Sequence, residues 1–366
     1  MKYFDRYKME FYPLSSRKSK VDIEETSIAP NSMAVPLPEP VNSRMETIAD
    51  EIIRAKNKGR SVILTFGAHT IKNGLGEVLA ALAEEEWVTH LATNGAGVIH
   101  DWEFAFQGLS SEDVRENVNK GRFGTWEETG FYINLALMNG AYRGFGYGEA
   151  IGSMITANGL EIPTESELMT TDIPLWKRAA ASDYLELIQA EKLKPGWMEI
   201  KHPFADFSIQ ARAYKKGTPF TSHPMFGHDI IYTHRANRGA AVGRCAERDF
   251  LAFADSISNL EDGVYLSIGS AVMSPMIFEK TLSMARNTAL RKNKDIRNCS
   301  IHVVDLQEET WDWSRGEPPI DNPAYYLRFM KTFNRMGCRI DYTSIDNRDF
   351  LLHLYRKLKN KRTESE

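Results

Sequence analysis

The sequence predicts an α/β protein in which a parallel sheet is flanked by helices. Short apolar stretches rich in β-branched residues alternate along the chain with longer stretches of helical periodicity. Several of the apolar stretches run straight into glycine-containing turns, which is typical of buried strands in a parallel sheet. A hydrophobic fraction of 42% and a charged fraction of 26% are ordinary for a globular protein.

The first strand–helix–strand unit begins with the apolar run at 61–66, which ends at Gly67. A helical pattern follows over 71–87. The next strand is predicted over 87–93 and leads into the turn Asn94-Gly95-Ala96-Gly97. Two strands joined through a helix in this way lie parallel, and the crossover between them is expected to be right-handed.

The same alternation is expected on both sides of this unit. Before it, residues 44–58 have helical periodicity that stops at Gly59. After residue 217, further strands are predicted at 218–222, 263–271, 299–306 and 340–344. Helices are predicted at 248–258, 276–291, 323–336 and 348–358.

Residues 1–43 are predicted to form an extended N-terminal arm. The part from residue 15 onward is first basic and polar and then contains four prolines, which favour extended backbone. A disordered leader and a segment draped over a neighbouring subunit are both compatible with this composition. The expected organisation is therefore the arm, 1–43, followed by one α/β domain over 44–366 with a helical insertion at about 125–200.

Charge and cysteine content limit the cellular setting. A net charge of -4 gives no electrostatic reason to expect a nucleic acid or an acidic membrane as partner. The three cysteines, Cys245, Cys299 and Cys338, are far apart and odd in number, so no disulfide framework is expected. The N-terminus has no apolar stretch like that of a secretory signal, and no run is apolar enough for a membrane helix. The cytoplasm is the expected compartment.

Small and polar residues recur where predicted parallel strands end, and ligands of open parallel sheets bind outside these ends. Glycine lets the backbone approach a phosphate, and the start of the following helix offers free N–H groups. None of the turns contains the G-x-G-x-x-G pattern. The predicted cofactor-binding residues are Gly67, Ala68, His69, Asn73, Gly74, Thr93, Asn94, Gly95, Gly97, Gly269, Ser270 and Asp305.

Histidines next to carboxylates also fall near predicted strand ends. The pairs His100 with Asp101 and His223 with Asp229 are candidate proton carriers on the substrate side. No H-x-x-x-H, H-x-H or H-E-x-x-H spacing occurs, so no metal ligands are assigned. A G-x-S-x-G nucleophile elbow is also missing from the sequence.

The order of these segments resembles deoxyhypusine synthase. Two strands that each run into a small and polar turn match the start of that family's pattern, and a strand with a glycine turn and helix matches its later part. The resemblance covers about two-thirds of the chain and rests on order and turn chemistry. It includes the segments 64–82, 88–102, 114–124, 214–231 and 263–287.

The resemblance implies a Rossmann-like subunit of a homotetramer, with NAD and a polyamine bound at the strand ends. Members of the family oxidise spermidine with NAD and transfer its aminobutyl group through an imine on a lysine. The family's catalytic histidine falls here near Ser274-Pro275, and its lysine falls near Arg328. Arginine stays protonated and cannot form the imine. Lys331 lies on nearly the same helical face and could take its place.

We therefore expect a deoxyhypusine synthase-like protein that binds NAD or a related nucleotide and has a changed amine or other small-molecule substrate. True deoxyhypusine synthesis is not expected. Arg328 joins His100, Asp101, His223 and Asp229 as the candidate catalytic residues. Two alternatives stay open, a metal-dependent hydrolase or lyase using the strand-end histidines, and a non-catalytic protein of ligand binding or assembly.

Overall fold

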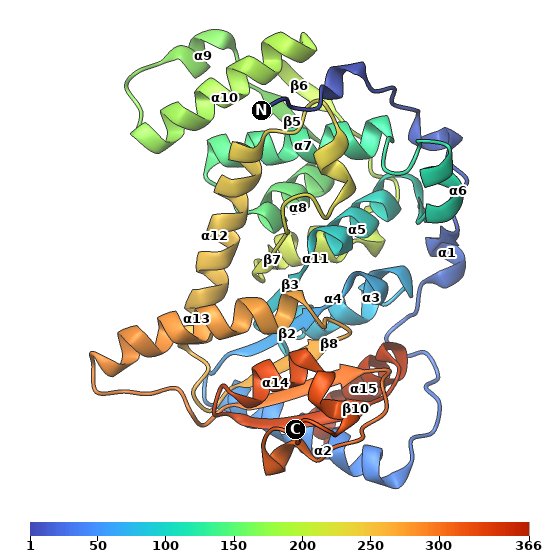
Figure 1. The fold of residues 1–366 in the computed structure, drawn as a ribbon, viewed down its shortest axis with the longest axis vertical. Helices are drawn as coiled ribbons and strands as arrows, with labels where there is room; N and C mark the ends of the chain where they lie inside the picture. The colour runs from blue at the N-terminus through green and yellow to red at the C-terminus, as the bar shows by residue number, and fades with distance from the viewer. Residues whose placement is uncertain (366) are drawn as a thin grey trace. The chain divides into compact units, whose positions relative to one another are not determined.

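The computed structural model describes residues 1–365, and the side chains of 1–363. The chain divides into two compact units, and Figure 1 labels most of their helices and strands. Unit 1 consists of Met1–Thr26, Val98–Lys215 and Pro224–Asp249, and unit 2 of Ser27–Gly97, Lys216–His223 and Phe250–Glu366. The predicted arm is thus shared between the units. The organisation of 44–366 as a single domain stays a prediction.

Unit 2 contains a six-stranded sheet in the order β10-β9-β8-β2-β3-β7, and every neighbouring pair is parallel. This sheet, flanked by helices, confirms the predicted α/β fold class. Its strands are β2 (Val62–Phe66), β3 (His90–Thr93), β7 (Phe220–Ser222), β8 (Val264–Ile268), β9 (Ser300–Asp305) and β10 (Arg339–Ser344).

The strand order reverses direction once. From the central strand β2 the chain adds β3 and then β7 on one side, and it adds β8, β9 and β10 on the other side. Counted within this sheet, the order is that of the doubly wound nucleotide-binding fold, 3-2-1-4-5-6. The reversal lies between β2 and β8, and the carboxyl ends of these two strands are where such sheets bind ligands.

Helices cover both faces of the sheet, which explains why the central strands are apolar throughout. All five residues of β2 and all five of β8 are buried. Ile63, Tyr265 and Ile301 lie in register on one face and belong to a core that includes Phe278 and Phe333. The helices of unit 2 are α2 (Glu39–Asn57), α3 (Ala68–Lys72), α4 (Gly76–Glu84), α13 (Met273–Leu290), α14 (Arg328–Asn334) and α15 (Asn347–Ser365).

The prediction of a single helix over 71–87 is wrong, because the structure has two helices, α3 and α4, in this segment. Gly74 has φ +77 between them, a left-handed conformation that interrupts helical hydrogen bonding. The backbone carbonyl of Gly74 accepts a hydrogen bond from the Ile28 N–H at 2.9 Å. This hydrogen bond therefore links the start of unit 2 to the segment between α3 and α4.

Unit 1 is mainly helical. Helix α7 packs against α8 and α10, and the antiparallel pair β5–β6 lies beside α7 and α8. Helices α5 and α12 each begin in one unit and end in the other. The elements are β1 (Val21–Asp22), α1 (Ile23–Thr26), α5 (Gly95–Gln107), β4 (Leu109–Ser110), α6 (Val114–Asn119), α7 (Glu127–Arg143), α8 (Tyr147–Ala157), β5 (Gly159–Ile162), α9 (Glu165–Met169), α10 (Leu175–Glu191), β6 (Gly196–Glu199), α11 (Ile209–Lys216) and α12 (Gly239–Ser258).

The first part of the predicted arm is held within unit 1 by a buried ion pair. Arg17 donates two hydrogen bonds to the Glu103 carboxylate, at 2.7 and 2.8 Å. The hydroxyls of Ser110 and Thr129 donate to the same carboxylate at 2.6 and 2.8 Å. Because removal of one partner would leave a buried charge unpaired, Arg17 fixes this segment firmly.

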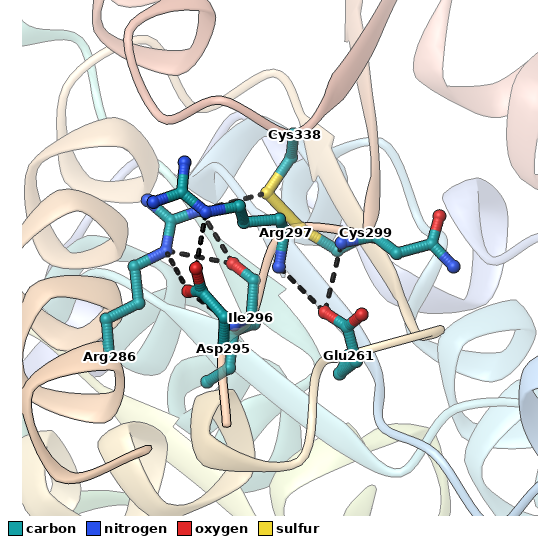
Figure 2. The surroundings of a disulfide bond; sticks show 8 residues. Glu261, Arg286, Asp295, Ile296, Arg297, Cys299 and Cys338 are labelled. Atoms are coloured by element: carbon teal, nitrogen blue, oxygen red, sulfur yellow. Dashed lines mark hydrogen bonds and ion pairs between the residues drawn. A yellow bond between two sulfur atoms is a disulfide. The ribbon is translucent and has the colours of Figure 1, made fainter. Parts of the chain in front are cut away.

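The expectation that the cysteines form no disulfide is wrong. Cys299 and Cys338 are bonded, with their Cα atoms 5.3 Å apart (Figure 2). They directly precede β9 and β10, whose parallel pairing sets Arg339 opposite Ser300. The two cysteines meet because the strands pair in this register, which a sequence separation of 39 does not reveal. Cys245 is free and buried.

Within the described residues, no helix has the length and apolar character that a membrane crossing requires.

Candidate functional site

Three of the predicted glycine-containing turns meet at one edge of the sheet of unit 2. Gly67 follows β2, Asn94 follows β3 and Gly269 follows β8. Because β8, β2 and β3 are parallel neighbours, their carboxyl ends lie side by side. The three turns therefore lie next to one another, as a shared site requires.

The turns after β2 and β8 touch through their backbones. A Cβ atom on Gly67 would lie 2.0 Å from the Gly269 carbonyl oxygen, so a side chain there would force the two turns apart. Gly269 itself has φ +56, and a Cβ added to it would meet no atom within 4 Å. Glycine is thus needed at Gly67 for close packing, while the space above Gly269 is open.

Each of the three turns leads into a helix. Gly67 is the N-cap of α3, and the Asn94 Oδ1 accepts a hydrogen bond from the Gly97 N–H at 2.9 Å in the first turn of α5. Helix α13, 18 residues long, follows the turn after β8. The first turn of a helix has N–H groups without intrahelical partners, and such groups bind phosphate.

All twelve predicted cofactor-binding residues belong to unit 2, but some of their side chains already have structural partners. The Thr93 hydroxyl donates to the Phe66 carbonyl at 2.9 Å, and the Asp305 Oδ1 accepts from the Leu306 N–H at 2.8 Å. The exposed Asn73 donates its amide hydrogen to Asn347 Oδ1 at 3.2 Å. His69 is exposed beside this turn. The roles of these residues in cofactor binding stay predictions.

His223 lies at the carboxyl end of β7, next to β3. Its backbone N–H donates to the Thr93 carbonyl at 2.9 Å, and its Nε2 is 2.9 Å from the Thr221 hydroxyl. Burial, together with the nearby His90, lowers the pKa of His223 to about 3. The imidazole is therefore neutral near pH 7 and can offer one hydrogen-bond donor and one acceptor, but no charge.

Asp101 and His100, predicted as a proton-carrying pair in unit 1, bond to different partners. Asp101 is buried and accepts hydrogen bonds from the Ser208 hydroxyl at 2.6 Å and from the Ile209 N–H at 3.0 Å. It thereby caps the start of α11. His100 Nδ1 lies 2.8 Å from the Ser110 hydroxyl, which belongs to the buried Glu103 cluster.

Asp229, also in unit 1, has a different character. Burial raises its pKa to about 7. It precedes the 3-10 helix Ile230–Thr233 but makes no capping hydrogen bond there. Its Oδ2 and the hydroxyls of Tyr147 and Tyr232 are buried without hydrogen-bond partners among the described residues. Burial and then the charge of Asp229 raise the pKa of both tyrosines.

Sequence reasoning missed Tyr147 and Tyr232 as neighbours of Asp229. The sequence offered little signal: Tyr147 lies in the aromatic and glycine-rich stretch 140–153, Tyr232 lies three residues after Asp229, and nothing paired the two. Buried polar groups without partners are uncommon in proteins, and they favour contact with water or a ligand. His223 belongs to unit 2 and Asp229 to unit 1, so their pairing as acid and base stays a prediction.

Arg328 is exposed at the first position of α14 in unit 2. One turn further on, Lys331 Nζ lies 3.5 Å from Glu317 Oε2 and 3.5 Å from the centre of the Tyr325 ring. The Lys331 amine is thus engaged by a carboxylate and an aromatic ring. Its exchange for the family's lysine stays a prediction.

In the part of the chain that the structure describes, no group of three or more histidine, cysteine, aspartate and glutamate side chains is arranged to hold a metal ion. The metal-dependent alternative has no candidate ligand set there.

Comparison with protein-family models gives no match. Comparison with curated protein sequences gives none either. Among solved structures, the chain is similar to a LOR/SDH protein of Methanococcus maripaludis S2 at a TM-score of 0.43 and 13% identity, covering 91% of this chain and 73% of that chain. ArgZ, a cyanobacterial arginine dihydrolase, gives a TM-score of 0.44 and 15% identity over 88% of this chain, which spans 32% of ArgZ.

A structure named as a deoxyhypusine synthase, from Entamoeba histolytica, gives a TM-score of 0.40 and 10% identity, covering 87% of this chain and 89% of that chain. Likenesses this distant transfer no residue role to the present chain.

Proposed function

We propose that unit 2 binds an ADP-containing dinucleotide, NAD in the first instance, across the carboxyl ends of β2 and β8. One observation supports this above all others: the strand order reverses between these two strands, and the turns that follow them touch at Gly67 and Gly269. Doubly wound sheets bind dinucleotides at such a reversal, with the pyrophosphate against a glycine-containing turn. The open space above Gly269 fits an approaching phosphate.

Position along the sheet assigns the two halves of the dinucleotide. The adenosine half would lie toward β3 and β7, and the nicotinamide half toward β8 and β9, as in other sheets of this order. NAD, when bound, supplies a hydride acceptor. The turns after β2 and β8 would hold and orient it.

The proposed substrate is an amine or another small molecule. Deoxyhypusine synthesis is not proposed, because the family resemblance puts Arg328 near the position of the imine-forming lysine. Among the candidate catalytic residues, Asp229 has a carboxyl group that can accept or release a proton near neutral pH, as its pKa of about 7 implies. A homo-oligomer, a homotetramer by the family resemblance, is part of the same proposal.

The test compares two glycine substitutions with the same backbone conformation. Gly269 has φ +56 and Gly59 has φ +61, and a Cβ added to either meets no atom within 4 Å. Asparagine tolerates this conformation better than other side chains. Gly269→Asn would fill the proposed pyrophosphate position, whereas Gly59→Asn places the same side chain after α2, at the amino end of β2.

Titration calorimetry with NAD and with ADP-ribose should show binding to the unmodified chain. We expect roughly tenfold or greater weakening in Gly269→Asn, and unchanged affinity in Gly59→Asn. The absence of binding to the unmodified chain, or equal affinity in the two variants, would contradict the proposed site. Addition of spermidine or putrescine to the complex tests the amine substrate separately.

A further inference from the structure

Four side chains of unit 2, contributed by α12, the start of β3, β7 and the residue after β7, form a continuous hydrogen-bonded row. His90 Nδ1 lies 2.8 Å from the Ser256 hydroxyl, and His90 Nε2 lies 2.9 Å from the Thr221 hydroxyl. The Thr221 hydroxyl lies 2.9 Å from His223 Nε2. The row runs from the half-exposed Ser256 to the end of β7.

Neither imidazole in the row carries a charge near neutral pH. Burial lowers the pKa of His90 to about 3, and burial together with His90 lowers that of His223 to about 3. Each neutral ring has one N–H donor and one bare nitrogen acceptor. A hydroxyl between two rings has a single proton to donate, so all hydrogen bonds in the row must point the same way.

The direction of the hydrogen bonds in the row determines whether His223 Nδ1 is a donor or an acceptor. If His90 donates to Thr221, the Thr221 hydroxyl donates to His223 Nε2, and His223 must carry its proton on Nδ1. If the direction reverses, Nδ1 is a bare acceptor. The Thr221 hydroxyl engages Nε2, so Nδ1 is the ring nitrogen that faces away from the row, and His223 keeps 7% of its surface exposed.

The place of His223 in the sheet suggests its ligand. In dinucleotide-binding sheets of this strand order, a carboxylate near the end of the second strand accepts a hydrogen bond from a ribose hydroxyl. The second strand here is β3, and Asn94 stands at its end with its Oδ1 already bonded to Gly97. His223 is bonded through its backbone to Thr93, the residue before Asn94.

We propose that His223 Nδ1 binds a hydroxyl of the adenosine ribose, and that His90 is a positioning residue that fixes which nitrogen of His223 carries the proton. The proposal rests on the proposed dinucleotide site. It assigns ribose recognition to a neutral imidazole in place of the usual carboxylate. Phe253 packs edge-on against both rings, with ring centres 5.3 Å from His90 and 5.1 Å from His223, and keeps the row in line.

Thr221→Val tests the row because it removes the bridging hydroxyl and keeps the shape of the side chain. Thr343→Val is the matched control, since Thr343 is an equally buried strand threonine at the other edge of the sheet. The ligands are ADP-ribose and its analogues that lack the 2′-hydroxyl or the 3′-hydroxyl of the adenosine ribose. We expect the unmodified chain and Thr343→Val to bind one deoxy analogue roughly fivefold to tenfold more weakly than ADP-ribose.

In Thr221→Val the affinities for ADP-ribose and for this deoxy analogue should differ by no more than about twofold. Binding of ADP-ribose with the same preference in Thr221→Val overturns the inference and leaves the dinucleotide site standing. Failure of the unmodified chain to bind ADP-ribose overturns both. Thermal unfolding of each variant shows whether it is folded.

A second measurement needs no ligand. The ¹⁵N shifts of labelled histidine distinguish a protonated nitrogen from a bare one. We expect His223 to show one protonated nitrogen in the unmodified chain and in Thr343→Val, and a mixture of both forms in Thr221→Val and His90→Phe. An unchanged single form in both of these variants would show that His90 does not position His223.

Discussion

At the scale of single residues, the Asp229 carboxyl group lies in a setting that gives it no counter-charge. Tyr147, fully buried, and Tyr232 contribute neutral hydroxyls, and the carboxylate oxygen Oδ2 has no hydrogen-bond partner within the described residues. Such surroundings favour the protonated acid. The pKa of about 7 makes the protonation of Asp229 a measurable property of unit 1.

Asp229→Asn should remove a pH dependence of stability. The folded pKa, about 7, lies above the ordinary value of 3.8, so the folded chain keeps a proton that the unfolded chain releases. This contribution to stability is complete below pH 4 and is lost as the pH rises through about 7. The variant should therefore match the original at pH 4 and exceed it at pH 8 by about 2–4 kcal/mol.

Urea unfolding at several pH values measures this difference. Asp206→Asn, a change of an exposed aspartate in the same unit, is the control and should leave the pH profile as it was. A profile of Asp229→Asn that runs parallel to that of the unmodified chain would show that folding does not raise the pKa of Asp229.

At the scale of elements, the disulfide joins the amino ends of β9 and β10. Arg286, on α13, donates two hydrogen bonds to the Ile296 carbonyl, at 2.8 and 2.6 Å, close to this bond (Figure 2). The backbone N–H groups of Arg297 and Asn298 donate to Glu261 at 2.7 and 3.0 Å. The connection before β9 is therefore fixed by polar contacts as well as by the covalent bond.

Loss of the disulfide should lower the stability of unit 2. A closed loop of this length restricts the unfolded chain, and the chain-entropy model gives about 4 kcal/mol for its removal. We expect Cys338→Ser to lower the free energy of unfolding by roughly 2–4 kcal/mol under oxidising conditions. Added dithiothreitol should lower the stability of the original chain and leave the variant unchanged, and Cys245→Ser serves as the control for loss of a thiol.

The sequence pattern located the strands better than the helices. All six sheet strands were predicted near their observed positions, because buried parallel strands give short apolar runs bounded by glycine. The helix predicted at 323–336 is instead a 3-10 turn, Pro323–Tyr326, followed by α14. Pro323 and the loop before it have turn chemistry that helical periodicity does not record.

The candidate site was predictable only where it depends on strand ends. Gly67, Asn94 and Gly269 were expected to lie together, and their neighbouring strands place them so. Three other features depend on pairings between distant segments. They are the strand order, the disulfide, and the electrostatic interaction between Asp229 and Tyr147. No periodicity or spacing in one sequence contains that information.

At the scale of the whole molecule, the two units should respond to acid differently. His90 and His223 are buried in unit 2 with pKa values of about 3, so the folded chain resists a protonation that the unfolded chain accepts below 6.5. Their contribution to stability is present above pH 6.5 and is lost as the pH falls toward 3. Asp229 in unit 1 has the opposite dependence.

We therefore expect the stability of unit 2 to fall on acidification from pH 7.5 to pH 5, by about 2 kcal/mol for each imidazole. Thermal unfolding at the two pH values should show a smaller loss in His90→Gln than in the unmodified chain. His69→Gln, a change of an exposed histidine in the same unit, should keep the original response. Equal losses in all three proteins would contradict the assignment.

The two central strands of the sheet, β2 and β8, are synthesised at widely separated times. β2 pairs with β8 across roughly 200 residues of intervening chain, and most of unit 1, all of it except Met1–Thr26, is synthesised between them. A nascent chain on the ribosome can align β2, β3 and β7, but one edge of β2 stays without its partner until β8 emerges. Long-range parallel pairing of this kind is slow, and an uncovered edge strand invites association with other chains. Premature termination before β8 would therefore leave a half-sheet prone to aggregation.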